Sequence, residues 1–134
     1  YNVRMGDPET EVVIPRLKND IVDIFISIAQ KTLNNVSLEI DDRAAATVML
    51  VSGGYPETYE KGKVIEGLNE IKDSILFHAG AVEKEGKIVT SGGRVLAVTS
   101  LGENYIEALT TSYNNVKKIH FEGMYYRKDL GFDL

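Results

Sequence analysis

Two apolar runs, each next to a pair of glycines, restrict the folds that this chain can adopt. Residues 44–51 have strand-forming side chains and end in the turn Ser52-Gly53-Gly54-Tyr55-Pro56, whereas residues 94–101 are typical of a buried strand and follow Ser91-Gly92-Gly93. A double glycine makes a tight turn, and it also lets backbone N–H groups approach a ligand. The residues alone favour the tight turn and leave the ligand-binding alternative open.

The segments around these runs predict an α+β fold. Residues 102–119 carry a narrow apolar stripe at helical spacing, formed by Ile106, Leu109, Tyr113 and Val116. Residues 74–82 and 87–90 have the pattern of a β-hairpin whose turn is Glu85-Gly86. Short strands are also expected at residues 63–65 and from His120. We therefore expect a small, mostly antiparallel sheet with the helix of residues 102–119 packed on it.

The N-terminal segment is predicted to be helical. Residues 9–33 divide into two helical pieces at Pro15 and the polar break Lys18-Asn19-Asp20, with Asn19 or Asp20 capping the second piece. An apolar stripe is expected to face a core, and its members are Val12, Val13, Leu17, Ile21, Ile24, Phe25 and Ile28. Residues 34–42 are polar and predict a linker, which places a domain boundary near residue 40.

Charge and composition exclude several classes of function. The net charge of −5 and the isoelectric point near 5.0 argue against a nucleic-acid binder, which needs a basic face. The sequence contains no cysteine, so disulfides and zinc–thiolate sites are excluded. No apolar run has the ~20 residues of a membrane span. The first residue is Tyr1 and no signal peptide is evident, so we interpret the chain as a piece of a cytoplasmic protein.

The first residues combine charged side chains with a glycine and a proline. The string Asn2-Val3-Arg4-Met5-Gly6-Asp7-Pro8-Glu9-Thr10-Glu11 is predicted to form a shaped loop followed by the first turn of a helix. Acidic residues in a first helical turn interact favourably with the helix dipole. An ordinary turn before a helix therefore explains Gly-Asp-Pro-Glu as well as a functional loop does.

The longer string resembles the signature of the phosphoribosylamine–glycine ligase family of the ATP-grasp superfamily. Further matches follow in the family's order, at Ser52-Gly53-Gly54-Tyr55-Pro56, Phe77-His78-Ala79-Gly80, Thr90-Ser91-Gly92-Gly93-Arg94-Val95-Leu96 and Tyr126-Arg127-Lys128-Asp129-Leu130-Gly131. The resemblance covers only the C-terminal part of the family chain. It implies that residues 1–40 end the ATP-grasp domain and that residues 41–134 are the C-terminal domain.

The resemblance implies a ligase of de novo purine biosynthesis that uses ATP and Mg²⁺ or Mn²⁺. Such an enzyme joins glycine to 5-phosphoribosylamine and releases glycinamide ribonucleotide, ADP and phosphate, through a glycyl-phosphate intermediate. The fragment alone is expected to be inactive, because the ATP-binding residues of the family lie in the missing N-terminal part of the chain. Two alternatives are another purine-pathway ATP-grasp ligase and a non-catalytic ligand-binding module.

The resemblance also implies roles for individual residues. The catalytic candidates are Arg4, Asp7 and Glu9, and the metal candidate is Asn2, the last residue of the family's Glu-x-Asn pair. The substrate-binding candidates are Gly6, Pro8, His78, Arg94, Arg127 and Lys128, of which Arg127 and Lys128 are expected at the ribose 5-phosphate. Alternatively, His78 is structural, Arg94 is a surface charge at a strand edge, and Arg127 and Lys128 are a solvated pair. The polar groups of residues 1–11 are expected to lack partners in this fragment.

Overall fold

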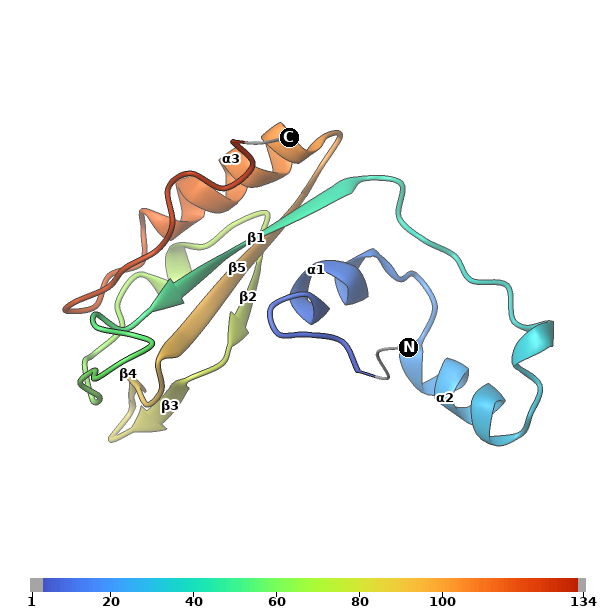
Figure 1. Ribbon diagram of the computed structural model, residues 1–134, viewed down its shortest axis with the longest axis horizontal. Helices are drawn as coiled ribbons and strands as arrows, with labels where there is room; N and C mark the ends of the chain where they lie inside the picture. Colours follow the sequence, from blue (N-terminus) through green and yellow to red (C-terminus); the bar gives the residue numbers. More distant parts are fainter. Residues whose placement is uncertain (1–3, 133–134) are drawn as a thin grey trace.

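The described part of the chain, residues 4–132 of a computed structural model, is built around a three-stranded antiparallel sheet (Figure 1). Its strands are β1 (Ala44–Val51), β5 (Arg94–Gly102) and β2 (Ile75–His78), in the order β1-β5-β2. A second, two-stranded sheet pairs β3 (Ala81–Lys84) with β4 (Lys87–Thr90). The predicted α+β fold with a mostly antiparallel sheet is therefore confirmed.

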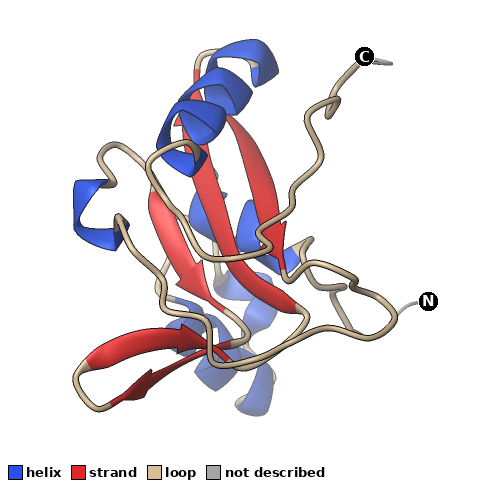
Figure 2. Ribbon diagram, turned by 90° about the vertical axis from the view of Figure 1, so that its left-hand side faces the viewer, coloured by secondary structure: helices blue, strands red, loops and turns tan. Residues whose placement is uncertain are grey.

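One face of the three-stranded sheet is covered by helix α3 (Tyr105–Val116), as Figure 2 shows. The strand register pairs Val48 with Val98 and Leu50 with Leu96, so these four side chains share a face. They form the core with Ile65, Val95, Val116, Ile119 and Phe121. This burial of large aliphatic and aromatic side chains drives the packing of α3 on the sheet.

Buried polar side chains also tie α3 to its neighbours. The Ser112 hydroxyl lies 2.8 Å from the Ser100 hydroxyl of β5 and 3.0 Å from the Ala46 carbonyl oxygen of β1. The Asn115 amide nitrogen donates to the Lys72 carbonyl oxygen and to the Ser74 hydroxyl, both at 2.6 Å. Buried polar groups with partners in this way set the position of the helix along the sheet.

The predicted hairpin turn is confirmed, but its first arm was predicted wrongly. Glu85 and Gly86 form the turn with φ angles of 53° and 75°. The expected single arm of residues 74–82 is two strands, because β2 pairs with β5 whereas β3 pairs with β4. The chain crosses between the sheets at Gly80, where a Cβ atom would lie 2.5 Å from the Arg94 carbonyl oxygen. Residues 63–65 and His120 make isolated bridges rather than strands.

The N-terminal arm consists of short helical pieces. Helix α1 (Thr10–Val13) continues as a 3-10 helix (Ile14–Arg16), and α2 (Ile21–Ala29) is followed by a 3-10 turn (Leu33–Asn35); a further 3-10 turn spans Leu68–Glu70. Asp20 caps α2 by accepting a hydrogen bond from the Val22 amide at 2.8 Å. The two predicted helical pieces and a cap at one of the two named residues are thus confirmed.

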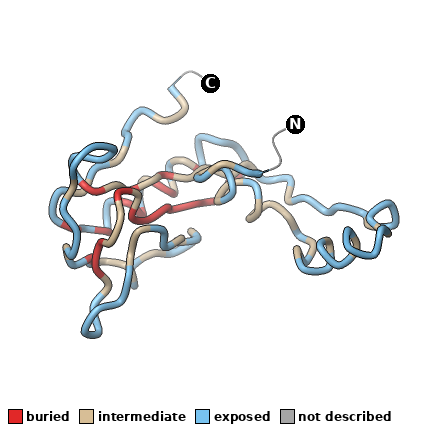
Figure 3. Tube along the Cα trace, turned by 60° about the horizontal axis from the view of Figure 1, so that its bottom comes forward, coloured by how far each residue is buried: buried red, intermediate tan, exposed pale blue. Residues whose placement is uncertain are grey.

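The predicted core-facing stripe of the N-terminal arm is wrong for this chain. No described residue before Val48 is buried (Figure 3). Helix α1 packs against β1 and β5, whereas α2 lies away from both sheets (Figure 1). The spacing of apolar residues defines which side of a helix is apolar, but it does not supply the surface that covers it. Among the described residues, none of the helices has the length and apolarity that crossing a bilayer requires.

Candidate functional site

The first loop is held by contacts of its own. The Gly6 amide donates to the Glu9 carboxylate at 2.9 Å, and the Thr10 amide and hydroxyl both donate to the Gly6 carbonyl oxygen at 3.0 Å. A Cβ atom on Gly6 would lie 2.7 Å from Oε2 of Glu9, so the absence of a side chain at Gly6 lets the Glu9 carboxylate approach the backbone. The prediction that Glu9 lacks a partner in this chain is therefore wrong.

Arg94 joins the first loop to the sheet. Its Nη1 donates to the Asp7 carbonyl oxygen at 2.8 Å, and its Nη2 lies 3.3 Å from the Asp7 carboxylate. The two residues are 87 positions apart in the chain. Their side chains are 38% and 50% exposed, so the pair remains accessible to a ligand. The prediction that Asp7 lacks a partner in this chain is also wrong.

A pocket of about 330 Å³ opens beside this pair, at the edge strand β1. We call it the edge pocket, and its lining residues are Pro8, Thr47, Met49, Val51, Tyr55, Arg94, Tyr125, Tyr126, Arg127 and Leu130. Three substrate-binding candidates, Pro8, Arg94 and Arg127, thus come together from distant parts of the chain. The arrangement combines aromatic and aliphatic walls with two guanidinium groups.

The C-terminal tail supplies one side of the edge pocket. Tyr125 forms two backbone hydrogen bonds with Val51 at the end of β1, at 2.9 and 3.0 Å. The Arg127 guanidinium donates to both Asp129 carboxylate oxygens at 3.0 and 3.1 Å. These hydrogen bonds raise the pKa of Arg127 and lower the pKa of Asp129. Lys128 is exposed and does not line the pocket, so the structure brings Arg127 to it without its neighbour.

The remaining candidates lie elsewhere. His78 is exposed at the end of β2 and does not line the edge pocket. Asn2 lies outside the described residues. Within residues 4–132 no three His, Asp or Glu side chains group in a way that would hold a metal ion. Arg4 is exposed in the loop that precedes Asp7.

The double-glycine turns pack against each other and against Tyr55. The Ser52 amide and hydroxyl donate to the carbonyl oxygens of Gly93 and Gly92, at 2.8 and 2.9 Å. The Tyr55 ring occupies the space beside Gly93, where a Cβ atom would lie 2.1 Å from the ring. The glycines thus serve close packing, and this packing places Tyr55 in the wall of the edge pocket.

Sequence reasoning singled out none of the three tyrosines of the edge pocket. Tyr55 and Tyr126 stand within two of the family motifs, and Tyr125 precedes the second, so their place in these motifs was the signal that could have indicated them. Glu11 was likewise not singled out. Its Oε2 is the only side-chain oxygen or nitrogen of the described residues that is shielded from solvent without a hydrogen-bond partner. Such an atom is costly unless a donor reaches it.

A comparison with known protein families shows the family to which the chain belongs. A model of the family described as "Phosphoribosylglycinamide synthetase, C domain" matches residues 45–133. The chain belongs to this family. The resemblance inferred from the motifs is confirmed, and the matched residues include every lining residue of the edge pocket except Pro8.

Relatives of this C-domain family extend the similarity to the N-terminal arm. The chain is 47% identical over 130 residues to the phosphoribosylamine–glycine ligase of Caldanaerobacter subterraneus subsp. tengcongensis, covering 97% of this chain and 31% of that protein. It is 44% identical over 135 residues to the trifunctional purine biosynthetic protein adenosine-3 of Gallus gallus, covering 98% of this chain and 14% of that protein. The chain thus spans less than a third of the relatives' length.

A solved structure shows the same arrangement. The crystal structure of the phosphoribosylamine–glycine ligase from Thermotoga maritima superposes with a TM-score of 0.76 at 39% sequence identity. The superposition covers 96% of this chain and 32% of that chain.

Proposed function

We propose that this chain is the C-terminal part of an ATP-dependent phosphoribosylamine–glycine ligase, which joins glycine to 5-phosphoribosylamine to give glycinamide ribonucleotide, ADP and phosphate through a glycyl-phosphate. The observation that carries the proposal is the 47% identity to a ligase of that name over 97% of this chain. In this assignment residues 1–40 end the ATP-grasp domain, residues 41–134 are the C-terminal domain, and the enzyme acts in purine biosynthesis in the cytoplasm.

In this proposal, the edge pocket binds the phosphoribosyl part of the substrate. Its volume of about 330 Å³ is at the lower end of the range for small-molecule sites. Arg127 contacts the 5-phosphate, because a planar guanidinium forms paired hydrogen bonds with phosphate oxygens. Arg94 supplies a second positive charge, and the tyrosines pack against the sugar.

The first loop orients the reacting groups. Arg94 holds Asp7 at 2.8 and 3.3 Å, and Glu9 closes the loop onto Gly6 at 2.9 Å. The loop thereby presents Arg4 and the exposed part of the Asp7 carboxylate towards the substrate amine and the acyl phosphate. This positioning is the contribution that we assign to Arg4, Asp7 and Glu9.

ATP and a divalent metal ion, Mg²⁺ or Mn²⁺, complete the proposed site. When bound, the metal supplies positive charge that offsets the charge of the transferring phosphate. The chain offers the Asn2 amide oxygen, a donor that hard cations accept. The carboxylates of Asp7 and Glu9 are engaged by Arg94 and by the Gly6 amide, which suits an orienting loop rather than a set of metal ligands.

A chimera tests the ligase assignment. Residues 1–134 replace the corresponding C-terminal part of the Caldanaerobacter ligase, and glycinamide ribonucleotide formation is measured with glycine, phosphoribosylamine and ATP. We expect product from the chimera and none from the truncated ligase or from this chain alone, because neither part holds the complete site.

Two results would contradict this assignment. Product formed by the isolated chain would show that it holds its own ATP site. A folded chimera that binds ATP but forms no product would favour the non-catalytic binding module.

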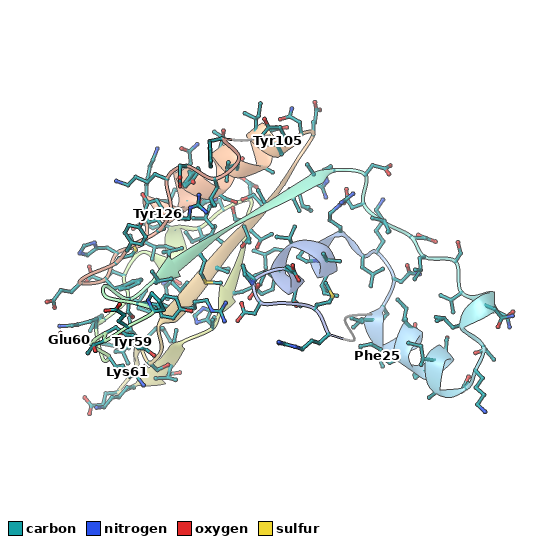
Figure 4. All side chains as sticks on the ribbon, in the orientation of Figure 1. Phe25, Tyr59, Glu60, Lys61, Tyr105 and Tyr126 are labelled. Carbon is teal, nitrogen blue, oxygen red and sulfur yellow. The ribbon has the colours of Figure 1, made fainter. Side chains whose placement is uncertain are left out.

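We propose that the apolar side of α2 packs against the part of the ligase outside this chain. Four of its side chains are 47% to 59% exposed, namely Val22, Phe25, Ile26 and Ile28. Figure 4 shows Phe25 on α2, apart from the sheets. A contiguous exposed apolar patch of this kind marks an interaction surface. The relatives, of which this chain covers about 31%, contain the additional protein needed to cover it.

Phe25→Glu tests this contact in two contexts. In the isolated chain Phe25 is 59% exposed, so we expect the free energy of unfolding to change by less than about 0.5 kcal/mol. In the chimera the new carboxylate enters an apolar interface, and we expect a loss of roughly 3 kcal/mol or more. Thermal or denaturant unfolding of both proteins gives the two values.

Val82→Glu is the matched control, because Val82 is 48% exposed on β3 and is expected to be silent in both contexts. A chimera that tolerates Phe25→Glu as well as Val82→Glu would remove the support for this contact.

A further inference from the structure

We infer that Tyr113 is a positioning residue for the phosphate end of the edge pocket. The inference rests on the proposed function, because it concerns the same substrate site. Tyr113 does not line the pocket itself. It acts through Arg127 and Leu130, which do line it and which lie on the tail that passes over α3.

The Tyr113 hydroxyl makes two contacts with this tail. It donates to the Arg127 carbonyl oxygen at 2.8 Å and accepts from the Leu130 amide at 3.3 Å. One hydroxyl therefore holds both ends of the segment formed by residues 127–130. The Tyr113 ring also lies 6.2 Å from the Tyr126 ring, whose place beside α3 is seen in Figure 4.

The residue that makes these contacts is packed against the core. Tyr113 is on α3, between the fully buried residues Ser112 and Val116, and it packs against the core. Upstream, the tail is fixed where Tyr125 pairs with Val51. The Tyr113 hydroxyl extends this fixation to the residues that follow, where the tail has left the edge of β1.

The side chain of Arg127 is oriented within the same segment. Asp129 accepts from Nε and Nη2, so it engages one edge of the guanidinium. A guanidinium has five N–H donors, so the two on Nη1 and one on Nη2 remain for a ligand. With its backbone held by Tyr113 and its guanidinium held by Asp129, Arg127 needs little ordering when an anion binds. Such preorganisation strengthens binding because it lowers the entropy lost on association.

Tyr113→Phe tests this role without changing any charge. Ribose 5-phosphate is titrated into the 134-residue chain and followed by NMR, with ribose as the ligand that lacks the phosphate. We expect Tyr113→Phe to weaken ribose 5-phosphate binding roughly threefold to tenfold, the range expected for losing the order of one flexible side chain. The melting temperature reports separately on a purely structural role.

Tyr59→Phe is the control variant. The Tyr59 ring contacts Tyr55 and Lys61, and these contacts do not need its hydroxyl. We expect this variant to bind ribose 5-phosphate like the unmodified chain.

Arg127→Ala separates this inference from the proposed function. Two results would overturn the proposed phosphate site, and the role of Tyr113 with it. One is that Arg127→Ala leaves ribose 5-phosphate binding unchanged. The other is that the unmodified chain binds ribose 5-phosphate no better than ribose. If Arg127→Ala weakens binding but Tyr113→Phe does not, only the role of Tyr113 is overturned. Weaker binding in Tyr113→Phe at an unchanged melting temperature supports it.

Discussion

Replacing Arg127 by alanine is expected to raise the KM for phosphoribosylamine ten- to a hundredfold in the ligase chimera, while the KM for ATP stays nearly unchanged. A charge-assisted hydrogen bond contributes roughly 1.5–3 kcal/mol, which corresponds to this change in affinity. The effect is selective because Arg127 lines the edge pocket, whereas the ATP-binding residues are expected outside this chain. Steady-state kinetics with each substrate varied in turn measures the two constants.

Lys128→Ala is the matched control for this experiment. It removes the same charge from the adjacent position, but Lys128 does not line the edge pocket. We expect a smaller increase in KM, because an exposed charge without a direct contact is screened by solvent. Equal effects of the two variants would show that only the net charge of the tail matters. Equal losses for ATP and phosphoribosylamine in Arg127→Ala would indicate a structural role.

Gly67→Ala is expected to destabilise this chain strongly. Gly67 has a φ angle of 82°, and a Cβ atom there would lie 1.9 Å from the Lys118 carbonyl oxygen. The left-handed conformation costs about 1–2 kcal/mol in a residue with a side chain. Displacing the backbone next to the buried Ile119 adds about 1–3 kcal/mol. We therefore expect the free energy of unfolding to fall by about 2–5 kcal/mol.

Gly62→Ala separates these two contributions. Gly62 has a φ angle of 80°, but no atom lies within 4 Å of the position of its Cβ. This variant is expected to lose only the conformational part, about 1–2 kcal/mol. Denaturant unfolding of both variants gives the difference that is due to the collision with Lys118. If both glycines cost the same, the close approach of Gly67 to Lys118 contributes nothing to stability.

Local sequence was sufficient to predict most elements of the sheet domain. The strands β1 and β5, the helix α3 and the turn at Glu85-Gly86 follow from strand-forming side chains, helical spacing and glycine conformation. These properties depend on residues close in sequence. The motifs were also sufficient to identify the family, because they occur in order along the whole chain.

Only the tertiary structure decided how residues 74–82 divide between two sheets. The pattern of this segment is compatible with one continuous strand. The division comes from the close packing of Gly80 against Gly92 and Arg94, whose backbones leave no space for a side chain. This packing depends on which strands become neighbours, which local sequence does not specify.

The same limit applies to α2 and to the edge pocket. The spacing of apolar residues predicted α2 and its apolar side. Whether that side is covered depends on the surface that packs against it, and no other part of the described residues buries the apolar side of α2. The sequence pointed to Asp7, Arg94 and Arg127 individually. Their meeting at one edge of the sheet, together with three tyrosines to which the sequence had given no role, follows from the pairing of β1 with β5 and with Tyr125. Strand pairing joins residues far apart in the chain, so only the assembled fold determines which side chains share a site.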